Sequence, residues 1–263
     1  MSRSERATRT VRRWLPAVVL PALIGPLWEW AAVTGRLPVS VAAPSAVWDE
    51  FERRHETLWF HTEPTIVAAV KGFVVAAAVA FTLALVAVLV PRVAGLVYSG
   101  AVVVSSIPLI ALTPVLVLWL DRGDAVRTAV AALAGVFPIL VGCVQGLRAT
   151  DARAEELFVQ LAAGRFQRLR LLALPSSLPF VFAGLKAAAA AAVLGAIIAE
   201  WSGGGGTRGL GQMMTNALFG FNVAQTWLTI LTAALLAVGF YAIASVVERF
   251  VVRWDHSVAD GAV

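Results

Sequence analysis

The charged segment at residues 154–179, AEELFVQLAAGRFQRLRLLALPSSLP, separates two long apolar blocks of the chain. Residues 152–166 contain no proline and only one glycine, and Leu157, Phe158 and Leu161 have the spacing of one apolar helix stripe. This pattern predicts a short amphipathic helix. Periodicity alone leaves two interpretations open: a helix that lies on lipid headgroups, or a helix that a partner protein binds.

The composition around this segment is that of an integral membrane protein. Of the 263 residues, 59% are hydrophobic and 14% are charged, and the mean hydropathy is +0.82, whereas soluble domains carry about 25% charged residues. The 21 Lys and Arg exceed the 16 Asp and Glu, which gives a net charge of +5. Because the basic residues flank apolar runs and form no single stripe, they indicate membrane topology and not nucleic-acid binding.

Apolar runs long enough to cross a bilayer predict an all-α polytopic protein with about six transmembrane helices. They lie at residues 14–34, 66–90, 93–120, 125–147, 178–201 and 223–252. Lys and Arg are concentrated in alternate connections, so the positive-inside rule predicts that both termini are cytoplasmic. The predicted organisation is a tail (1–13), a first span (14–34), an extracytoplasmic segment (35–63), a five-span core (64–252) with a cytoplasmic loop at 148–175, and a second tail (253–263).

The sequence contains little that supports enzyme chemistry. The stretch GGGGTRG at residues 203–209 lacks the Lys-Ser/Thr ending of a phosphate-binding loop. We therefore expect a flexible extracytoplasmic loop there, and no ATP hydrolysis by this chain. His55, His61 and His256 lie outside the predicted spans and are expected to be solvated. An intramembrane metal site or Ser/His protease is therefore not expected.

Ionisable residues within the spans are few: Glu29, Lys71, Arg127, Lys186 and Glu200. Glu29, Arg127 and Glu200 lie near predicted outer ends, where such side chains extend to the membrane interface. Lys71 and Lys186 lie deeper, where an unpaired charge is costly. A structural ion pair or a contact with a backbone carbonyl between spans is expected for both, in preference to direct contact with the solute.

Candidates for lining a solute path are polar residues within the spans: Ser105, Ser106, Gln145, Lys186 and Glu200. Serine also tightens helix packing in lipid, which explains the first two equally well. Pro108, Pro114 and Pro138 are expected to bend their helices. The small-residue run at 186–196 predicts close helix packing and suits a dimer seam.

Residues 48–61, WDEFERRHETLWFH, place aromatic residues among charged ones. This predicts an amphipathic helix at the outer membrane interface, where tryptophans concentrate. The alternative is a docking surface for a binding protein.

The 154–179 segment resembles the EAA loop of ABC-importer permeases. With Leu174 and Pro175 aligned to the motif's closing Leu-Pro, the motif glutamate falls on Glu156 and its glycine on Ala162. Leu157 and Phe158 replace the two motif alanines. The resemblance implies that partner ATPases bind this loop through Glu156, Leu157, Phe158, Leu161, Ala162, Gly164, Arg165, Leu174 and Pro175. Pro175 is expected to end the loop helix, with Pro179 in the first turn of the next helix.

Further stretches extend the likeness over nearly the whole chain. SSIPLIALTPVLVLWL, LPSSLPFVFAGLKAAAAAAVLGAIIAEW and ERFVVRWD are similar to the nitrate, sulfonate and taurine branch of these permeases, and AEW also to carriers of thiamine pyrimidine precursors. The resemblance implies a type I importer fold in the bacterial plasma membrane. It also implies alternating access, a pair of ATPase subunits that bind ATP, a second permease copy, an extracytoplasmic binding protein and membrane lipid as partners. A passive channel and a non-transporting membrane scaffold remain the alternatives from other classes.

Overall fold

The computed structural model describes residues 23–252, apart from the side chains of Pro91, Arg148 and Arg165, and it confirms the all-α prediction. Every regular element in that range is helical. Residues 23–33 are helical, and the following elements are α2 (Pro44–Leu89), α3 (Pro91–Ser105), α4 (Leu109–Leu120), α5 (Asp124–Arg148), α6 (Ala152–Gln160), α7 (Arg165–Arg168), η1 (Leu169–Ala173), α8 (Leu174–Trp201), α9 (Leu210–Phe219) and α10 (Val223–Val251).

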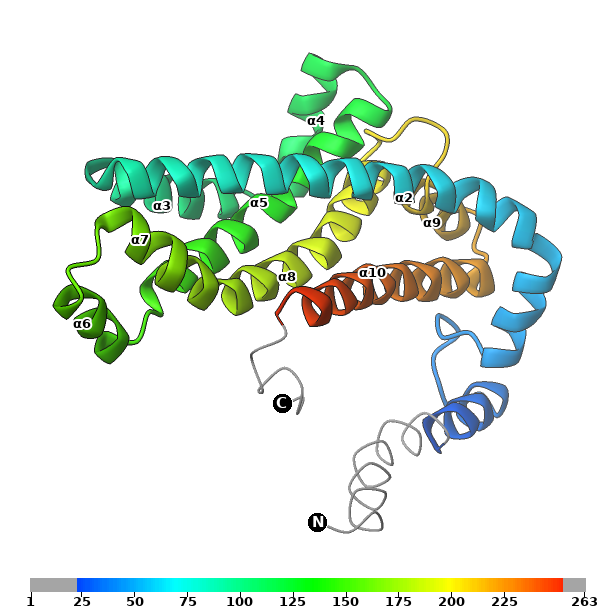
Figure 1. Ribbon diagram of the computed structural model, residues 1–263. Coiled ribbons are helices and arrows are strands. Elements are labelled where there is room, and N and C mark those ends of the chain that lie inside the picture. Colours follow the sequence, from blue (N-terminus) through cyan, green and yellow to red (C-terminus); the bar gives the residue numbers. More distant parts are fainter. Residues whose placement is uncertain (1–22, 253–263) are drawn as a thin grey trace, which may run out of the picture.

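Helices α5 and α8 form the centre of the molecule, and α2 and α10 pack against them (Figure 1). The two central helices approach closely because glycine and alanine occupy their contact faces. A Cβ on Gly142 would meet the Phe180 carbonyl, and one on Gly184 would meet the Pro138 carbonyl. In a bilayer the hydrophobic effect does not drive helices together, so association depends on close packing, which small residues at the crossing allow.

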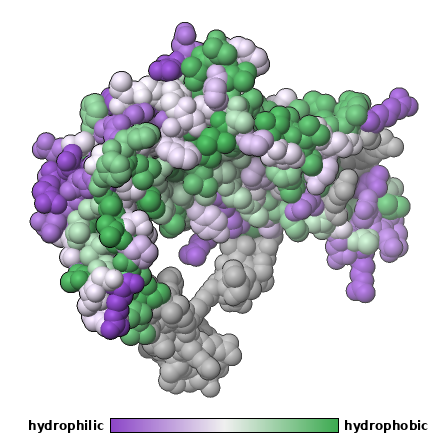
Figure 2. Space-filling view, turned by 180° about the vertical axis from the view of Figure 1, so that it is seen from behind, coloured by the Kyte–Doolittle hydropathy of each residue, from purple (hydrophilic) through white to green (hydrophobic). Residues whose placement is uncertain are grey.

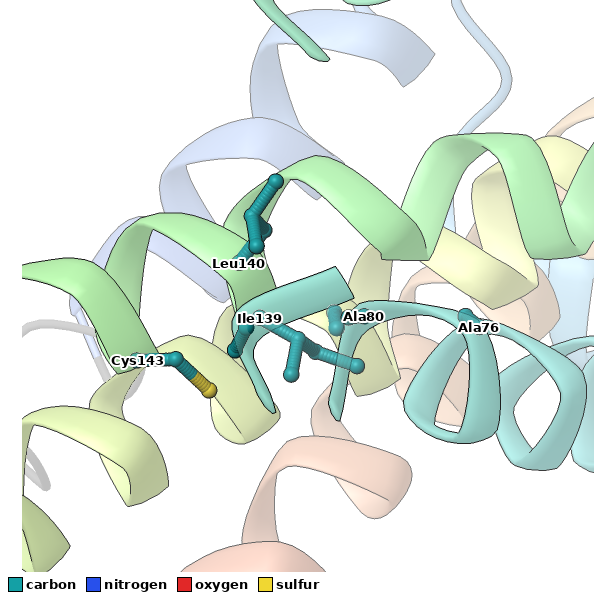
Figure 3. Packing of buried hydrophobic residues seen from close by; sticks show 7 residues of the cluster. Ala76, Ala80, Ile139, Leu140 and Cys143 are labelled. Carbon is teal, nitrogen blue, oxygen red and sulfur yellow. The ribbon is translucent and has the colours of Figure 1, made fainter. Parts of the chain in front are cut away.

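The alanine face of α2 covers the same centre. Ala76 and Ala80 are fully buried against Ile139, Leu140 and Cys143 of α5 (Figure 3). The hydrophobic packing in this part of the chain is therefore made of small residues on one helix and larger aliphatic residues on the next.

The described residues contain four helices that are long and apolar enough to cross a membrane, or five if the bent pair α3–α4 counts as one span. The predicted count of six is not confirmed, because the first predicted span falls partly outside the described residues. Helix α2 is 46 residues long with a kink at Arg54. Beyond this kink it continues from the segment predicted to be extracytoplasmic into the second predicted span.

The predicted span at 93–120 is not one straight helix. Helices α3 and α4 meet at an angle of 94°. Pro108 caps α4 and has no amide proton, and the hydroxyls of Ser105 and Ser106 each donate to the Val102 carbonyl, at 2.8 Å. The bend thus falls where side chains compete with the backbone for helical hydrogen bonds.

The prediction that Pro175 ends the loop helix is wrong. Residues Phe166–Trp201 form one continuous helix of 36 residues. The chain accommodates Pro175 by widening the preceding turn into the π-helix η1, in which the Leu174 amide donates to the Leu169 carbonyl. Pro179 lies inside α8 and not in its first turn. Such a widened turn takes up a proline that lacks the amide proton of a regular helix.

Candidate functional site

The amphipathic helix of the 154–179 segment is α6, and it protrudes at the end of the molecule where α5 ends and α8 begins (Figure 1). The Asp151 side chain caps it by accepting a hydrogen bond from the Arg153 amide, at 2.9 Å. No residue of α6 is buried. Leu157 is 53% exposed and Leu161 69% exposed, as is Phe166 at 72% on α7. This apolar surface lacks a partner within the described residues.

Helix α6 is shorter than the sequence suggested and ends at Gln160 in a turn built around Ala162. The Ala163 amide donates to the Phe158 carbonyl and the Ala162 amide to the Val159 carbonyl, both at 3.0 Å. This is the hydrogen-bond pattern of a Schellman C-cap. Ala162 has φ +52°, a left-handed conformation that glycine adopts without strain. The position aligned to the motif glycine is therefore the one whose backbone favours glycine.

The other residues of the predicted contact surface lie on α6, directly after this turn, and at the start of α8. Glu156 is exposed on α6, and the Gly164 amide donates to Oε1 of Gln167 at 3.0 Å. Leu174 and Pro175 line an apolar groove of about 650 Å³ between the ends of α2, α5 and α8. Helix α6, its turn and the start of the 36-residue helix thus form one continuous stretch.

The candidate path residues are not brought together in one place. Ser105 lies at the α3–α4 bend and lines two grooves of about 330 and 380 Å³. Gln145 is exposed on α5 and lines neither groove. Lys186 and Glu200 are both on α8 and lie about 21 Å apart along its axis, at about 1.5 Å per residue. Of the five candidates, Ser105 is the one that lines the grooves at the bend.

The deeper lysines form the predicted ion pairs. Nζ of Lys71 donates to a carboxylate oxygen of Asp124 across α2 and α5. Nζ of Lys186 lies 2.7 Å from Oε2 of Glu248 across α8 and α10, and the Glu248 side chain is only 6% exposed. The prediction of structural pairs between spans is confirmed for both residues.

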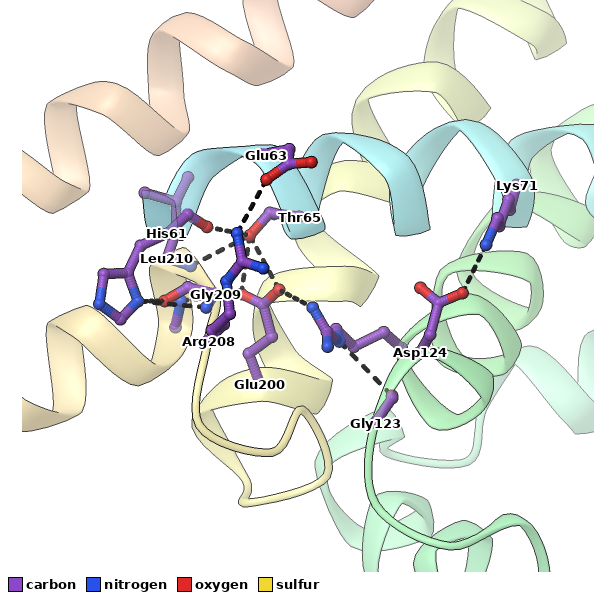
Figure 4. A network of polar contacts seen from close by, with 12 residues as sticks. His61, Glu63, Thr65, Lys71, Gly123, Asp124, Glu200, Arg208, Gly209 and Leu210 are labelled. Atoms are coloured by element: carbon purple, nitrogen blue, oxygen red, sulfur yellow. Dashed lines mark hydrogen bonds and ion pairs between the residues drawn. The ribbon is translucent and has the colours of Figure 1, made fainter. Parts of the chain in front are cut away.

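Glu200, in contrast, does not extend to the interface as predicted. It is completely buried. Its carboxylate accepts hydrogen bonds from the Thr65 hydroxyl at 2.8 and 3.0 Å and from the Gly211 amide at 2.9 Å. Thr65 in turn accepts from the Leu210 amide at 3.0 Å (Figure 4). Arg127 is 8% exposed, and its Nη1 lies 3.7 Å from Oε1 of Glu200, which is an ion pair but too long for a hydrogen bond.

The glycine-rich loop is fitted around this carboxylate, which corrects the prediction of a flexible loop. Gly204 and Gly205 are buried. A Cβ on Gly205 would meet Glu200 at 2.7 Å, and a Cβ on Gly209 would overlap the carboxylate itself. The glycines therefore clear the space that lets the loop backbone contact Glu200.

Two further residues hold the same loop, and His61 is not the solvated residue that was expected. Its Nδ1 lies 3.2 Å from the amide nitrogen and 3.0 Å from the carbonyl oxygen of Gly209. Arg208 donates to a Glu63 carboxylate oxygen at 2.8 Å and to the Phe60 carbonyl at 3.0 Å. The missed signal was an acidic residue at the end of a span, separated by two residues from a run of glycines.

The predicted amphipathic helix at 48–61 is the first part of α2, and the α9–α10 corner holds it. Glu50 is 4% exposed. Its carboxylate lies 2.7 Å from Nε of Arg54 and accepts a hydrogen bond from Nδ2 of Asn222 at 3.1 Å. Trp48 and Trp59 are 61% and 64% exposed, so this segment presents aromatic surface outward at the end of the molecule opposite α6.

A family model described as the binding-protein-dependent transport system inner membrane component matches residues 72–254. The chain is 30% identical over 229 residues to the formylaminopyrimidine transport permease protein ThiX of Halalkalibacterium halodurans, covering 87% of this chain and 91% of that protein. It is 32% identical over 152 residues to the riboflavin transport system permease protein RibX of Chloroflexus aurantiacus, covering 58% and 56%. The putative aliphatic sulfonates transport permease protein SsuC of Bacillus subtilis is 23% identical over 247 residues, covering 93% and 89%.

The chain therefore belongs to the family of binding-protein-dependent inner-membrane transport components, the permeases of ABC importers. It is a multi-pass membrane protein with a transport role. The resemblance found in the sequence is confirmed at this level.

Proposed function

We propose that α6 and its turn form the surface that partner ATPase subunits grip, so that nucleotide-driven closure of the ATPases moves the spans. One observation carries this proposal: α6 and its turn expose Leu157 and Leu161 to solvent and lead into a continuous helix that spans the molecule. A lipid-lying helix does not need this continuity. A helix that transmits movement does, because a flexible connection would absorb the displacement.

The test is co-purification of the permease with its ATPase subunits, in which the natural chain is compared with Glu156→Lys. Charge reversal on the exposed motif glutamate is expected to lower recovery of the ATPase by at least about tenfold, because like-charge placement in an interface costs several kcal/mol. Glu155→Lys is the matched control, since it makes the same charge change on the neighbouring exposed residue. Equal ATPase recovery for the natural chain and Glu156→Lys would contradict the proposal.

We further propose that two copies of this chain enclose the path along the broken helix α3–α4. Large apolar side chains there point away from the rest of the chain: Leu96, Val103, Leu118 and Trp119 are 73%, 65%, 83% and 73% exposed. The two grooves beside Ser105 lie between α3 and α5, and one of them also reaches α8. A second copy would convert these open grooves into a closed passage. Native mass measurement in nanodiscs is expected to give two permease chains per complex.

For the solute we propose a small aromatic heterocycle of the vitamin-precursor type. The support is that the relatives at 30% and 32% identity are named for formylaminopyrimidine and riboflavin, whereas the sulfonate relative is at 23%. A nitrate, sulfonate or taurine-type solute remains the second candidate. Uptake of labelled formylaminopyrimidine, riboflavin and taurine by cells with and without the permease separates the two classes, and uptake of taurine alone would decide against the heterocycle.

A further inference from the structure

The outer end of α8 carries a buried acidic centre that the coupling role of α6 does not explain. Glu200 is the second-last residue of this helix, and its carboxylate accepts hydrogen bonds from the Thr65 hydroxyl of α2 and from the Gly211 amide of α9. A fully buried carboxylate costs far more than an apolar residue of the same size unless donors surround it. The free-energy cost of burying the Glu200 carboxylate is offset here by hydrogen bonds that fix the position of the neighbouring loop.

The backbone of the glycine-rich loop packs directly against the Glu200 side chain. Gly205, Gly209 and Gly211 all pass within contact distance of the Glu200 side chain, and none leaves room for a Cβ. Leu210 is fully buried, and Met213 is 1% exposed, in a cluster with Leu58 of α2 and Leu228 of α10. Helix α9 is thus tied to α8 through Glu200 and packed on α10 through its apolar side.

The helix that ends at Glu200 begins next to α6. Phe166–Trp201 is continuous over 36 residues, about 54 Å at about 1.5 Å per residue. Figure 1 shows α6 and α7 at one end of the molecule and α9 with its loop toward the other. A displacement at α7 therefore reaches the residue that holds α9 without crossing a non-helical connection.

We propose that Glu200 is a positioning residue that clamps the glycine-rich loop and α9 to the outer end of α8, so that α9 moves together with the cytoplasmic end of this helix. The relay part of this inference rests on the proposed contact of α6 with ATPases. The clamp part rests on the contacts of Glu200 alone. In this role Glu200 holds the glycine-rich loop and α9 on α8 while α8 moves, and it does not contact the solute.

The clamp is tested in the permease alone by hydrogen exchange in nanodiscs. Glu200→Ala removes the acceptor of the Gly211 amide and the partner of the Thr65 hydroxyl, which itself accepts from the Leu210 amide. The Gly211 amide is therefore expected to lose protection by about tenfold or more, and the Leu210 amide to lose protection because Thr65 is no longer held in place. Thr65→Val, a milder change of similar shape, keeps the test valid if Glu200→Ala does not fold. Glu50→Ala is the comparison variant, because Glu50 is also a buried carboxylate at this end but contacts Arg54 and Asn222, and not the amides of Leu210 or Gly211.

The relay is tested in the complex with ATPase subunits, using spin labels that report distances between the two copies, in a Cys143→Ala background. One label is placed at Arg153 on α6 and the other, in a separate sample, at Asn216 on α9. Addition of ATP with vanadate is expected to change both distances in the natural chain. In Glu200→Ala or Thr65→Val the α6 distance still changes, while the change at α9 is lost.

The outcomes separate this inference from the proposed function. Unchanged exchange at Leu210 and Gly211, or an α9 distance that still follows α6 in both variants, overturns the clamp. A general loss of thermal stability with equal movement of α6 and α9 also overturns it, because that is a structural role only. If α6 in the natural complex does not respond to ATP with vanadate, the ATPase contact is wrong, and the exchange measurement decides the clamp by itself.

Discussion

At the scale of single residues, backbone strain at Ala162 and buried charges at Glu200 and Glu248 mark the places where the chain departs from simple membrane packing. Ala162 holds a left-handed conformation that costs an L-residue roughly 1–2 kcal/mol. Glu248 is buried beside Lys186 in the interior of the helix bundle. Single substitutions test the backbone strain at Ala162 and the burial of the Lys186–Glu248 pair.

Ala162→Gly is expected to stabilise the α6 turn by about 1 kcal/mol, because glycine adopts the positive φ of this residue without strain. The measurement is hydrogen exchange of the α6 amides, whose exchange should become slower. Ala163→Gly is the matched control, since Ala163 is not among the residues with positive φ and glycine there only adds flexibility. Equal effects of the two substitutions would show that the conformation of Ala162 is not what limits the turn.

Lys186→Met is expected to destabilise the protein by about 3 kcal/mol, because it leaves the Glu248 carboxylate buried without its partner. The double variant Lys186→Met with Glu248→Gln is expected to recover most of this loss. The measurement is thermal stability in detergent for each single variant and for the pair. If the double variant regains stability and uptake together, the pair is structural; regained stability with uptake still absent would place Lys186 on the solute path.

At the scale of elements, the crossing of α5 and α8 is set by glycine. The ideal Cβ of Gly184 would lie 2.6 Å from the Pro138 carbonyl oxygen, and that of Gly142 would lie 2.5 Å from the Phe180 carbonyl oxygen. Pro138 has no amide proton, so one carbonyl of the preceding turn lacks its helical partner, and the glycines let the facing helix approach this stretch. The distance between α5 and α8 is therefore set by these two glycines.

Gly184→Ala is expected to destabilise the helix pair by about 1–3 kcal/mol, because the added methyl group forces two backbones apart. Gly239→Ala on α10 is the control: no atom lies within 4 Å of its added Cβ, so a gain of up to about 1 kcal/mol from helix propensity is expected. The measurement is again thermal stability of the purified permease. A neutral Gly184→Ala would show that the α5–α8 distance is not fixed by this contact.

At the scale of the whole molecule, apolar side chains cover the surface between two hydrophilic ends. Figure 2 shows this distribution from one side, with purple side chains gathered toward the ends and green ones between them. Helix α6 lies at one end, and the α9–α10 corner with the first part of α2 lies at the other (Figure 1). The positive-inside rule assigns α6 to the cytoplasm, and this orientation can be measured directly.

Single-cysteine labelling tests the orientation of the two ends. Cys143, the one cysteine of the sequence, is 4% exposed and gives little background. Arg122→Cys, in the connection between α4 and α5, is expected to react with a membrane-impermeant maleimide in intact cells. Gln160→Cys, at the end of α6, is expected to react only after the membrane is opened. The reverse pattern would place α6 outside and would remove the basis for its contact with ATPases.

The amino-acid sequence by itself determined the class of protein, the approximate spans and the position of the α6 segment. These depend on local composition, on the length of apolar runs and on the spacing of Leu157 and Leu161, all of which are encoded within short windows. The structural ion pairs of Lys71 and Lys186 were also foreseeable, because an isolated charge in a span needs a partner.

Only the tertiary structure decided how these pieces act on one another. The size of the 94° bend between α3 and α4 and the widened turn that carries the helix through Pro175 are seen only in the folded chain. The burial of Glu200 under the glycine-rich loop depends on contacts between distant segments. From the local sequence alone, a carboxylate at the end of a span is expected to extend to the membrane interface. Hydrogen-bond donors from α2 and α9 surround this carboxylate only because the glycines allow their backbones to approach it. No single stretch of sequence specifies this approach.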